Sequence, residues 1–575
     1  MSTDLFRAAG LESETSEGAD DLAIFVEQAE YLPPESFLAY SIEHPQEEDI
    51  VRKLVSGGAK LLVGPRGCGK TTLMLKALHR MQTDKLGRAL PVYVNFKLSL
   101  KLEPLYLSTP NATFWFRTWL ILKIYQAVHE AISSLGFDSE RGGLPTLDEI
   151  TDAILTIESG DSSAFNKSIE YQVDEMIDLL EATIVDFGFN RCVLLLDDAA
   201  HAFSPKQQED FFDFFRRIKG QRIAPKAAIY PGITSLSPSF HVGHDAEQID
   251  VWIRPDTQRY VEFMSELAAK RLGGSIPVAL AADPETIPFL AFSAFGIPRS
   301  FLNMIRYLES DFNNSSSVDR RRVLEAAKQS RQDAHAVFDS LAFKLPVYKN
   351  FILRGDELYT RLISFVKDFN KSKPLSIQAV EFGIKRPVPQ ELHKLIGFFQ
   401  YAGLIMHSGE NSRGIKGVFD IYFLHFADLI TENAIVSQRT KSIPQFVSVF
   451  RAPKHQVWPR ISPERLTGNN PDKAFALALP PCQSCGAERT NEDARFCANC
   501  GAQLKMASLY KSLVGQEISV LPITKARAAT IKKHSNIRTI KDILLDSTRE
   551  ELRGVPQVGA KWAERIARYA EEHVA

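Results

Sequence analysis

KLLVGPRGCGKTT, residues Lys60–Thr72, is the stretch that decides the fold of this chain. Leu61–Val63 is a short apolar run, which predicts a buried strand. From Gly64 onward the residues fill the pattern G-x-x-x-x-G-K-[ST] at every required position. The following segment, Leu73–Met81, has a helical pattern with few breakers. A strand, a glycine loop and a helix in this order predict a loop that binds phosphate groups.

The chemistry of the loop points to a nucleoside triphosphate. Backbone N–H groups near the glycines face inward around a phosphate, and the helix dipole adds positive potential there. Lys70 is expected to reach the β- and γ-phosphate oxygens, and the hydroxyl of Thr71 is expected to hold Mg²⁺. The strand–loop–helix context disfavours the alternative, a chance glycine turn before a helix. The candidate nucleotide-binding residues are Gly64, Pro65, Arg66, Gly67, Cys68, Gly69, Lys70, Thr71 and Thr72.

Length and composition limit the classes of protein. A chain of 575 residues predicts three or more domains. The net charge of −2 gives no global electrostatic argument for nucleic acid, so any such contact must be local to one domain. There is no run of about eighteen uncharged apolar residues, and the N-terminus is acidic, so neither a membrane span nor a signal peptide is expected. Four of the six cysteines form two C-x-x-C pairs, which predicts a metal site in the reducing cytoplasm.

A second stretch supplies carboxylates. The apolar run Arg191–Leu196 ends in Asp197 and Asp198. A buried parallel strand that ends in acidic residues is typical of a Mg²⁺ site beside a phosphate loop. We expect Asp197 to hold Mg²⁺ through water and Asp198 to polarise the attacking water. The alternative, a strand that merely ends in a polar turn, is disfavoured by the phosphate loop.

Three further strands complete the predicted core. They are expected at Leu90–Leu98, Ala227–Ile233 and Gln248–Ile253. Five strands with helical crossovers predict a parallel, doubly wound α/β layer that binds nucleotide at the carboxyl edge of its sheet. Thr234 or Ser235, at the tip of the fourth strand, is expected to sense the γ-phosphate.

A third motif, AFGIPRSF at Ala294–Phe301, lies in a helical segment. Together with GPRGCGKTT and VLLLDDA it makes residues 22–345 resemble AAA+ ATPases, above all the origin-recognition-complex and archaeal initiator branch and the related signal-transduction ATPases. The resemblance implies ATP and Mg²⁺ as cofactors. It also implies that Arg299, on a helical lid, touches the γ-phosphate. By itself the Gly-Ile-Pro turn predicts only a helix start with an exposed arginine.

Two departures from the family bear on hydrolysis. Asp198 stands where most relatives use glutamate, and its shorter side chain leaves the hydrolysis rate open. Relatives commonly carry a trans-acting arginine before the fifth strand, whereas Ser235–Glu247 contains none. The sequence therefore favours a slow switch that distinguishes ATP from ADP, and it leaves oligomerisation open.

Residues 346–445 resemble a winged helix. The loop between its two strands carries Arg413 and Lys416, which are candidate contacts to DNA phosphates. The alternative is that the wing packs on the α/β core as a regulatory lid, and both readings stay open. Two helices and two strands are expected there: Asp356–Asn370, Pro389–Tyr401, Leu404–His407 and Val418–Phe423.

Two cysteine pairs follow a proline-rich segment. Cys482, Cys485, Cys497 and Cys500 form a C-x2-C…C-x2-C set, which supplies four thiolates for tetrahedral zinc. So short a segment cannot bury a core without a metal. Disulfides are the alternative, which a cytoplasmic chain disfavours.

The C-terminal segment LRGVPQVGAKWAERI, residues 552–566, resembles the helix-hairpin-helix motif. With the residues before it, it is similar to the C-terminal domain of the bacterial RNA polymerase α subunit. Gln557 replaces the first glycine of the motif. Gly559 precedes a helix, and the N-terminus of a helix attracts anions even without the family resemblance. The alternative is a hairpin that docks on another protein. The resemblance implies backbone DNA contacts at Arg553, Val558, Gly559 and Lys561.

The sequence thus predicts an α/β protein with several C-terminal modules. The leading hypothesis is a cytoplasmic ATP-driven switch that binds DNA, without a membrane contact. The alternative is a signalling or antiphage-defence scaffold whose C-terminal modules recruit protein partners. The expected organisation is a disordered segment 1–20, an ATPase core 21–254 with a helical insertion at about 104–185, a lid 255–345, a winged helix 346–445, a basic linker 446–480, a zinc ribbon 481–505 and a helix-hairpin-helix domain 506–575.

Overall fold

The central element is a five-stranded sheet in which every pairing is parallel, with the order β2-β3-β4-β1-β5. This confirms the predicted α/β class. The strands are β1 (Lys60–Val63), β2 (Ala89–Asn95), β3 (Arg191–Asp197), β4 (Ile223–Ile229) and β5 (Glu247–Asp250). The computed structural model describes residues 34–83, 88–108, 111–139, 143–159, 171–199, 204–436, 442–452, 458–468, 475–489, 494, 496–504 and 508–574; the segment 1–20 lies outside them.

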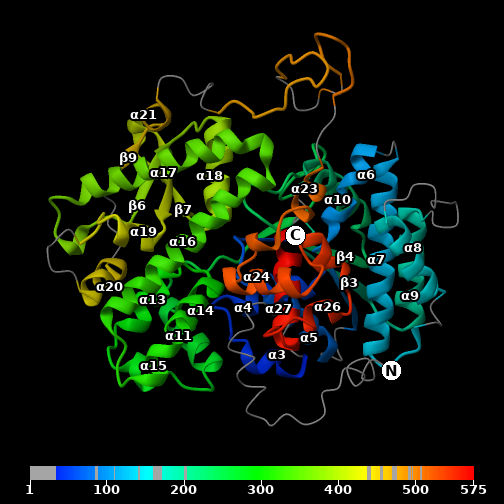
Figure 1. The fold of residues 1–575 in the computed structure, drawn as a ribbon, viewed down its shortest axis with the longest axis horizontal. Coiled ribbons are helices and arrows are strands. Elements are labelled where there is room, and N and C mark those ends of the chain that lie inside the picture. The colour runs from blue at the N-terminus through cyan, green and yellow to red at the C-terminus, as the bar shows by residue number, and fades with distance from the viewer. Residues whose placement is uncertain are drawn as a thin grey trace.

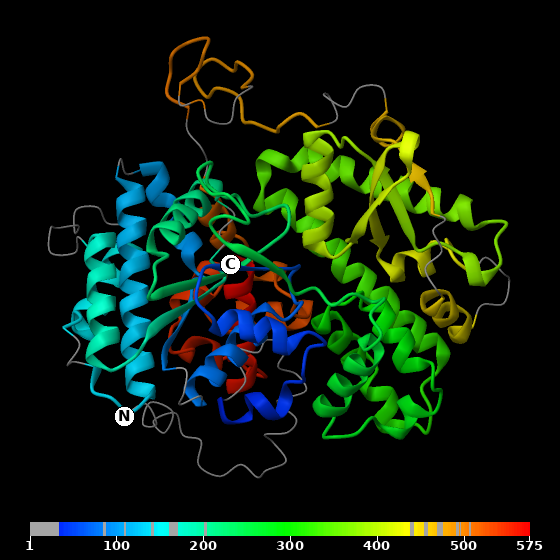
Figure 2. The ribbon, with the colours of Figure 1, turned by 180° about the vertical axis from the view of Figure 1, so that it is seen from behind.

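Both faces of the sheet are covered because its strands alternate between two apolar cores. In β3, Val193 and Leu195 join the core that contains α5, while Leu194 and Leu196 join the core of the helical insertion. The insertion and α/β core fill one half of the molecule, and the helices and strands from α11 to α21 fill the other half (Figures 1 and 2). The helices of this part are α3 (Pro34–Tyr40), α4 (Glu47–Val55), α5 (Lys70–Thr83), α6 (Glu103–Ser108), α7 (Ala112–Ser134), α8 (Leu147–Ser159), α9 (Val173–Asp186) and α10 (Pro205–Ile218).

Helix α7 is the most apolar helix that the sequence predicted. Its side chains are buried on nearly every side, among the sheet, α8 and α10. Among the described residues, no helix combines the length and the hydropathy that crossing a membrane requires.

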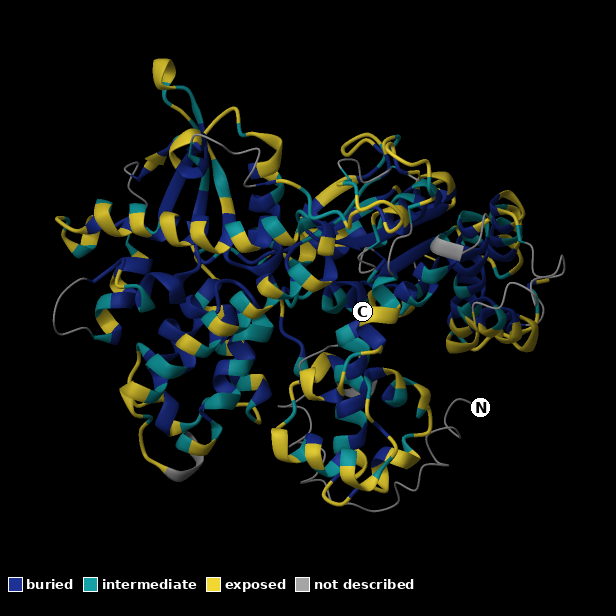
Figure 3. Cartoon of the chain, turned by 45° about the horizontal axis from the view of Figure 1, so that its top comes forward, coloured by how far each residue is buried: buried dark blue, intermediate teal, exposed yellow. Residues whose placement is uncertain are grey.

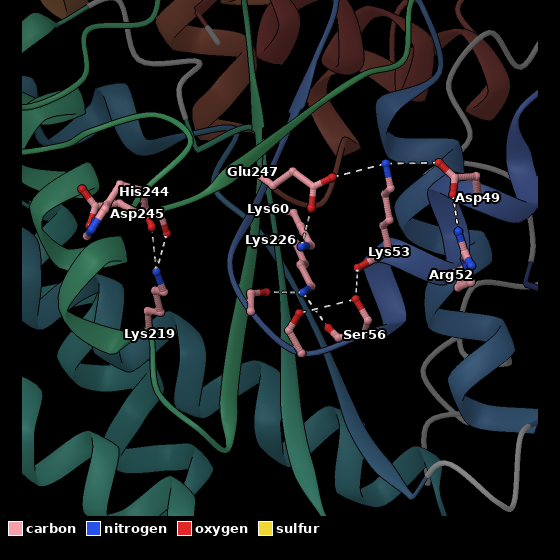
Figure 4. Close-up of polar contacts among 12 residues, drawn as sticks. Asp49, Arg52, Lys53, Ser56, Lys60, Lys219, Lys226, His244, Asp245 and Glu247 are labelled. Carbon is pink, nitrogen blue, oxygen red and sulfur yellow. Dashed lines mark hydrogen bonds and ion pairs between the residues drawn. The ribbon is translucent and has the colours of Figure 1, made fainter.

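Strand β4 begins earlier in the sequence than expected, because Pro225 and Lys226 look unlike residues of a central strand. In the structure Pro225 pairs with Leu194 of β3. The Lys226 ammonium is fully buried and donates hydrogen bonds to the carbonyls of Ser56, at 2.7 Å, and Gly58 (Figure 4). These contacts lie at the amino edge of the sheet, opposite the phosphate loop. The lysine is tolerated in the core because its donors meet backbone acceptors.

Two modules follow the sheet. The lid, residues 255–345, contains α11 (Tyr260–Arg271), α12 (Val278–Ala281), α13 (Thr286–Ser293), α14 (Pro298–Tyr307), α15 (Glu309–Asn314) and α16 (Arg320–Lys344). The wing module, residues 346–445, contains α17 (Lys349–Asn370), β6 (Glu381–Lys385), α18 (Gln390–Ala402), β7 (Ile405–Ser412), β8 (Val418–Leu424) and α19 (Phe426–Thr431). Strands β6, β8 and β7 are antiparallel neighbours. Residues 386–389 are too few to hold a second helix before α18, so the pair of helices that a helix-turn-helix uses is not formed there.

A buried carboxylate joins the lid to the wing module. Asp428 of α19 accepts hydrogen bonds from Arg331 Nε at 2.7 Å, His335 Nε2 at 3.0 Å and the Tyr359 hydroxyl at 2.9 Å. These three donors come from α16 and α17. Buried charge is stabilising only when it is paired in this way.

The predicted basic linker 446–480 is wrong for the part that the structure describes. This region contains most of α20 (Ile443–Arg451), β9 (Arg460–Ile461) and α21 (Pro463–Thr467), and β9 pairs with β6. Pro444 lies in the first turn of α20, where proline is favourable. Two of the described cations of this region have partners: Arg451 lies 3.0 Å from Glu285, and Arg465 lies over the ring of Phe365.

The two C-terminal modules differ in their attachment. The cysteine segment stands away from the helices and sheets as an orange loop (Figure 1). The terminal domain, residues 508–574, instead packs against the α/β core, and Leu100 of that core is part of its apolar cluster. The C-terminus therefore lies in the middle of the molecule (Figure 3). The helices of this domain are α23 (Leu509–Val514), α24 (Lys525–His534), α25 (Ile540–Leu545), α26 (Glu550–Arg553) and α27 (Ala560–Val574).

Candidate nucleotide site

The glycine loop connects β1 to α5 as predicted. Gly67 and Gly69 have φ values of 83° and 100°, in the region that glycine adopts without steric cost. A Cβ atom on Gly64 would lie 2.6 Å from Cys68 Sγ, so the loop is folded tightly on itself. Helix α5 begins at Lys70, and its N-terminus therefore faces the loop.

Lys70 lies inside this loop and is only 5% exposed. Its ammonium donates hydrogen bonds to the carbonyl oxygens of Gly64 at 2.9 Å and Pro65 at 3.0 Å. It also lies 3.8 Å from the centroid of the Tyr230 ring. Burial lowers the pKa of Lys70, and the nearby carboxylates of Asp198 and Asp197 oppose that shift. Lys70 therefore lies near both aspartates, and it lines one cavity together with Asp198.

The aspartates at the end of β3 hold different positions. Asp197 is 1% exposed, and its carboxylate accepts hydrogen bonds from the backbone N–H of Asp198 at 3.0 Å and the Tyr93 hydroxyl at 2.9 Å. Asp198 lines the cavity and has a φ of 51°, a strained value for a residue other than glycine. The Tyr230 hydroxyl donates to Asp198 Oδ1 at 3.1 Å. The chain thus aims Asp198 into the cavity and keeps Asp197 behind it.

One cavity brings together most of the predicted nucleotide-binding residues. It is lined by Arg66, Gly67, Cys68, Gly69, Lys70, Thr71 and Thr72, together with Asp198 and Arg299. Gly64 and Pro65 lie behind this wall and bond Lys70. The Thr71 hydroxyl and the two carboxylates are oxygen donors of the kind that Mg²⁺ prefers. This end of the cavity fits a phosphate chain with its cation.

The other end of the cavity was missed by sequence reasoning. It is lined by apolar and aromatic residues of α3 and the lid, including Phe37, Tyr40, Phe263 and Leu302. His44 also lines it; burial lowers the pKa of His44 to about 4, and its Nδ1 accepts from the backbone N–H of Gln46 at 3.1 Å. A flat apolar end next to a polar end suits a base attached to phosphates. Residues 33–45, PPESFLAYSIEHP, carry no motif that would have announced it.

The lid is packed directly against the glycine loop. The backbone N–H of Arg299 points to the carbonyl of Gly67 at 3.5 Å, and a Cβ atom on Gly67 would lie 3.0 Å from Arg299 Cβ. The Gly296 turn is held by Trp252, whose Nε1 donates to the Phe295 carbonyl at 2.9 Å. Arg299 thereby reaches the cavity from the first turn of α14.

Tyr230 occupies the place expected for Thr234. It is the first residue after β4 and lines the cavity, while Thr234 is not among the described residues that do so. The Thr234 hydroxyl instead accepts a hydrogen bond from the backbone N–H of Tyr230 at 2.9 Å. The predicted strand ended too late because it ran through Pro231 and Gly232, which are turn residues.

The wing module touches the same edge of the core. Tyr401 of α18 packs edge-on against Tyr230, with ring centroids 5.6 Å apart. The backbones of Gly232 and Gly397 are so close that a Cβ atom on Gly232 would lie 2.2 Å from the carbonyl carbon of Gly397. Helix α18 is largely buried in this contact and in its own module. Of the wing cations, Lys416 is exposed, whereas the Arg413 guanidinium lies 5.7 Å from the Trp458 ring.

The four predicted zinc ligands lie together. The sulfur atoms of Cys482 and Cys500, and those of Cys485 and Cys497, are 3.6 Å apart, and all four lie within 4.8 Å of one another. Tetrahedral Zn–S bonds of about 2.3 Å place sulfur atoms about 3.8 Å apart, whereas a disulfide requires about 2.05 Å. The sulfur positions therefore fit a zinc ion.

The predicted hairpin contacts divide into exposed and buried groups. Gln557 has a φ of 64°, so it adopts the conformation for which the motif uses glycine. Gly559 and Lys561 are exposed, and Arg553 is half-exposed with its guanidinium 3.8 Å from Glu564. Val558 is buried and its N–H donates to the Val555 carbonyl at 3.0 Å, so that amide is already bonded.

The comparisons with known proteins found only distant similarity. No protein family and no curated protein matches the sequence. Solved structures with a similar arrangement include the ORC1 protein of Aeropyrum pernix in complex with DNA, with 17% identity over 72% of this chain and 96% of that chain, and a TM-score of 0.30. A Walker-type ATPase of Pyrococcus abyssi is 14% identical over 72% and 99% of the two chains, with a TM-score of 0.38. Cdc6p from Pyrobaculum aerophilum is 14% identical over 74% and 97%, with a TM-score of 0.30. With TM-scores this low, the fold assignment rests on the strand order of this chain itself.

Proposed function

We propose that this protein is a cytoplasmic ATP-binding switch of the AAA+ type that hydrolyses ATP slowly and binds DNA through its C-terminal modules. The observation that carries the proposal is the single cavity that Lys70, Thr71, Asp198 and Arg299 share. Its polar end lies at the carboxyl edge of a parallel sheet, where nucleotides bind in folds of this kind.

The proposed roles follow from the positions of the side chains. Lys70 exchanges its two carbonyl partners for phosphate oxygens, and the backbone N–H groups of the loop bind the same phosphates. Thr71 and, through water, Asp197 would hold Mg²⁺, which would neutralise charge on the phosphates. Asp198 orients the attacking water, and Arg299 contacts the third phosphate from the lid. The short arm of Asp198 is the reason that we propose slow hydrolysis.

Binding of a fluorescent ATP analogue to Lys70→Ala tests the nucleotide site. A hydrogen bond to a charged group contributes about 1.5–3 kcal/mol, so the affinity should fall about 10- to 100-fold. Lys328→Ala, the same change at an exposed position on α16, is the matched control and should bind normally. Unchanged affinity and turnover in Lys70→Ala would refute the assignment.

A second variant separates binding from chemistry. Asp198→Asn keeps the size of the side chain but removes the carboxylate that orients water. It should bind the ATP analogue within about twofold of wild type, and turnover should fall by about 100-fold or more. Equal turnover in both proteins would remove Asp198 from the reaction.

For the cysteine segment we propose a structural zinc ion held by four thiolates. Four protein ligands leave no open position for a reacting water, so its role is to hold the segment together. Metal analysis of the purified chain should give one zinc per molecule, and Cys497→Ser should lower that content. A full zinc content in Cys497→Ser would contradict the assignment.

We propose that the terminal domain binds DNA phosphates at the start of α27. Gly559 and Lys561 are exposed there, and the N-terminus of a helix attracts anions. Duplex binding by Lys561→Glu should be weaker at low salt, with a salt slope shallower by about one. Lys541→Glu carries the same charge change on an exposed face of α25 and is the control. Equal slopes in both variants would count against this contact.

The alternative, a signalling or antiphage-defence scaffold, is favoured by the position of α18. That helix is packed on the α/β core, as expected of a regulatory lid and not of a helix that enters a DNA groove. A gel shift on duplex DNA at two salt concentrations, with and without ATP, distinguishes the two functions. No shift at low salt favours recruitment of protein partners by the C-terminal modules.

A further inference from the structure

The last turn of α27 lies beside the glycine loop. Arg66 Nη2 is 4.0 Å from Glu572 Oε2, which joins the loop to the C-terminal end of the chain. The same domain is attached a second time through Glu103, whose carboxylate accepts from the Ser508 hydroxyl at 2.5 Å and the Leu509 N–H at 3.2 Å. The terminal domain is therefore docked on the α/β core at the mouth of the candidate nucleotide site.

Arg66 lies on the side of the loop that faces the aspartates. Its guanidinium is close to Tyr230, Tyr401 and Asp198 as well as Glu572, and it lines the same cavity as Lys70. In the proposed binding mode the third phosphate lies between Lys70, Asp198 and Arg299. Arg66 lines the same cavity as these three residues.

A second cation lies near Glu572 but is not among the described residues that line the nucleotide cavity. Lys344, the last residue of α16, is 7% exposed. Burial and the charge of Arg66 lower the pKa of Lys344 to about 7, and the carboxylate of Glu572 opposes the shift. Next to Glu572, Glu571 lines a cavity together with Lys97, which also lines the nucleotide cavity. The end of α27 thus places carboxylates beside two cations that line the nucleotide cavity, Arg66 and Lys97.

We propose that Glu572 belongs to the nucleotide site: it and the third phosphate compete for Arg66, so that triphosphate, but not diphosphate, loosens the terminal domain from the α/β core. The inference rests on the proposed function, because it requires ATP in this cavity. A terminal phosphate carries more negative charge and more acceptor oxygens than one carboxylate, so it binds the Arg66 guanidinium more strongly than Glu572 does. Since Lys561 lies at the other end of α27, one helix connects the nucleotide to the candidate DNA contact.

Hydrogen exchange on the full chain tests the loosening. Amides of residues 99–105 and 508–516, on the two sides of the docking contact, are followed without nucleotide, with Mg²⁺-ADP and with a Mg²⁺-bound non-hydrolysable ATP analogue. Exchange there should become about fivefold faster with the triphosphate only, the lower end of usual coupling between sites. Lys70→Ala, which is expected to bind nucleotide about 10- to 100-fold more weakly, should show no change at a nucleotide concentration that saturates only wild type.

Glu572→Gln tests the competition itself. Without the carboxylate, affinity for the triphosphate analogue should rise about fivefold and affinity for ADP should stay the same. Glu564→Gln makes the same change two turns earlier on α27, beside Arg553, and should alter neither affinity. Glu572→Asp, which retains the charge, should restore most of the wild-type preference.

The outcomes separate the two proposals. If the triphosphate binds wild type but neither the exchange at the docking contact nor the nucleotide preference of Glu572→Gln changes, the competition is wrong and the proposed function stands. If wild type binds neither nucleotide, both proposals fail.

Discussion

The two edges of the parallel sheet each contain a buried lysine, and the pair shows what distinguishes a functional cation from a structural one. Lys70 at the carboxyl edge and Lys226 at the amino edge both donate to two backbone carbonyls. Burial lowers the pKa of Lys226 to about 7, the charges of Lys60 and Arg191 add to this shift, and the carboxylate of Glu247 opposes it. Lys60 and Glu247 are drawn near Lys226 in Figure 4. Lys70 instead lies near two carboxylates and lines a cavity. Backbone carbonyl partners are enough to stabilise a buried ammonium. Nearby carboxylates together with a cavity indicate that the ammonium takes part in binding or catalysis.

Changing both lysines to methionine gives the largest contrast. Lys70→Met should lose nucleotide binding and change the free energy of unfolding by less than about 1 kcal/mol, because the loop carbonyls can be hydrated from the cavity. Lys226→Met should lower the free energy of unfolding by about 4 kcal/mol, since two buried carbonyls lose their donor. Its nucleotide affinity below the unfolding transition should stay within about twofold of wild type. Denaturant titrations measure the free energy of unfolding and nucleotide titrations measure the affinity. Equal losses of stability and of affinity in both variants would contradict the different roles of the two lysines.

Asp428 is a buried carboxylate that is not among the described residues lining the nucleotide cavity, so it tests the same distinction between structural and functional charges. Asp428→Asn should lower the free energy of unfolding by about 3 kcal/mol, because Arg331 and His335 lose their buried counter-charge. Nucleotide affinity should not change. Denaturant titration and nucleotide titration at pH 6 measure both effects, and a loss of affinity in the folded variant would contradict a purely structural role.

The stabilisation by Asp428 should also depend on pH. Burial alone would raise the pKa of Asp428, but the hydrogen bond from His335 and the nearby ring of His425, whose Nδ1 lies 3.5 Å from Asp428 Oδ2, outweigh it and hold the pKa well below its usual range. A depressed pKa gives stability that is present above the unfolded value of about 4 and is lost as the pH falls below it. Burial also lowers the pKa of His335, but Asp428 outweighs this and raises it, so that contribution is lost above about pH 6.5 as the proton leaves. Wild type and Asp428→Asn should therefore differ most between about pH 4 and 6.5, and a difference independent of pH would contradict this account.

Tyr230→Phe makes the smallest change at the functional edge. It removes the hydroxyl that donates to Asp198 but keeps the ring beneath Lys70. The free energy of unfolding should fall by about 1 kcal/mol and turnover by about fivefold, with unchanged nucleotide affinity. Turnover equal to that of wild type would show that Asp198 is positioned without Tyr230.

Sequence alone predicted the parts of the site that are local in the chain. The loop from Gly64 to Thr71 and the aspartates after β3 each follow a strand and carry their own pattern. The start of strand β4 was predicted too late in the sequence. Proline and lysine are unusual in a central strand, and the backbone partners that accommodate Pro225 and Lys226 are visible only in the structure. Helix α20 was missed because Pro444 begins it.

The rest of the site depends on contacts between distant segments. Tyr401 reaches Tyr230 from another module, and Glu572 reaches Arg66 from the last turn of the chain. Neither residue lies in a motif that marks such a contact. Each becomes visible only when tertiary packing brings the two segments together.

The contact between Gly232 and Gly397 has a mechanical consequence. Here two backbones meet with no side chain between them, and an added Cβ on Gly397 would lie 2.4 Å from the Gly232 Cα. Because the clash is with backbone atoms, no side-chain rotamer relieves it. A single methyl group at either glycine would therefore push the wing module away from the α/β core. Gly397→Ala should therefore separate α18 from the α/β core beside the candidate phosphate site. The hydrophobic cores on both sides of the contact should stay intact.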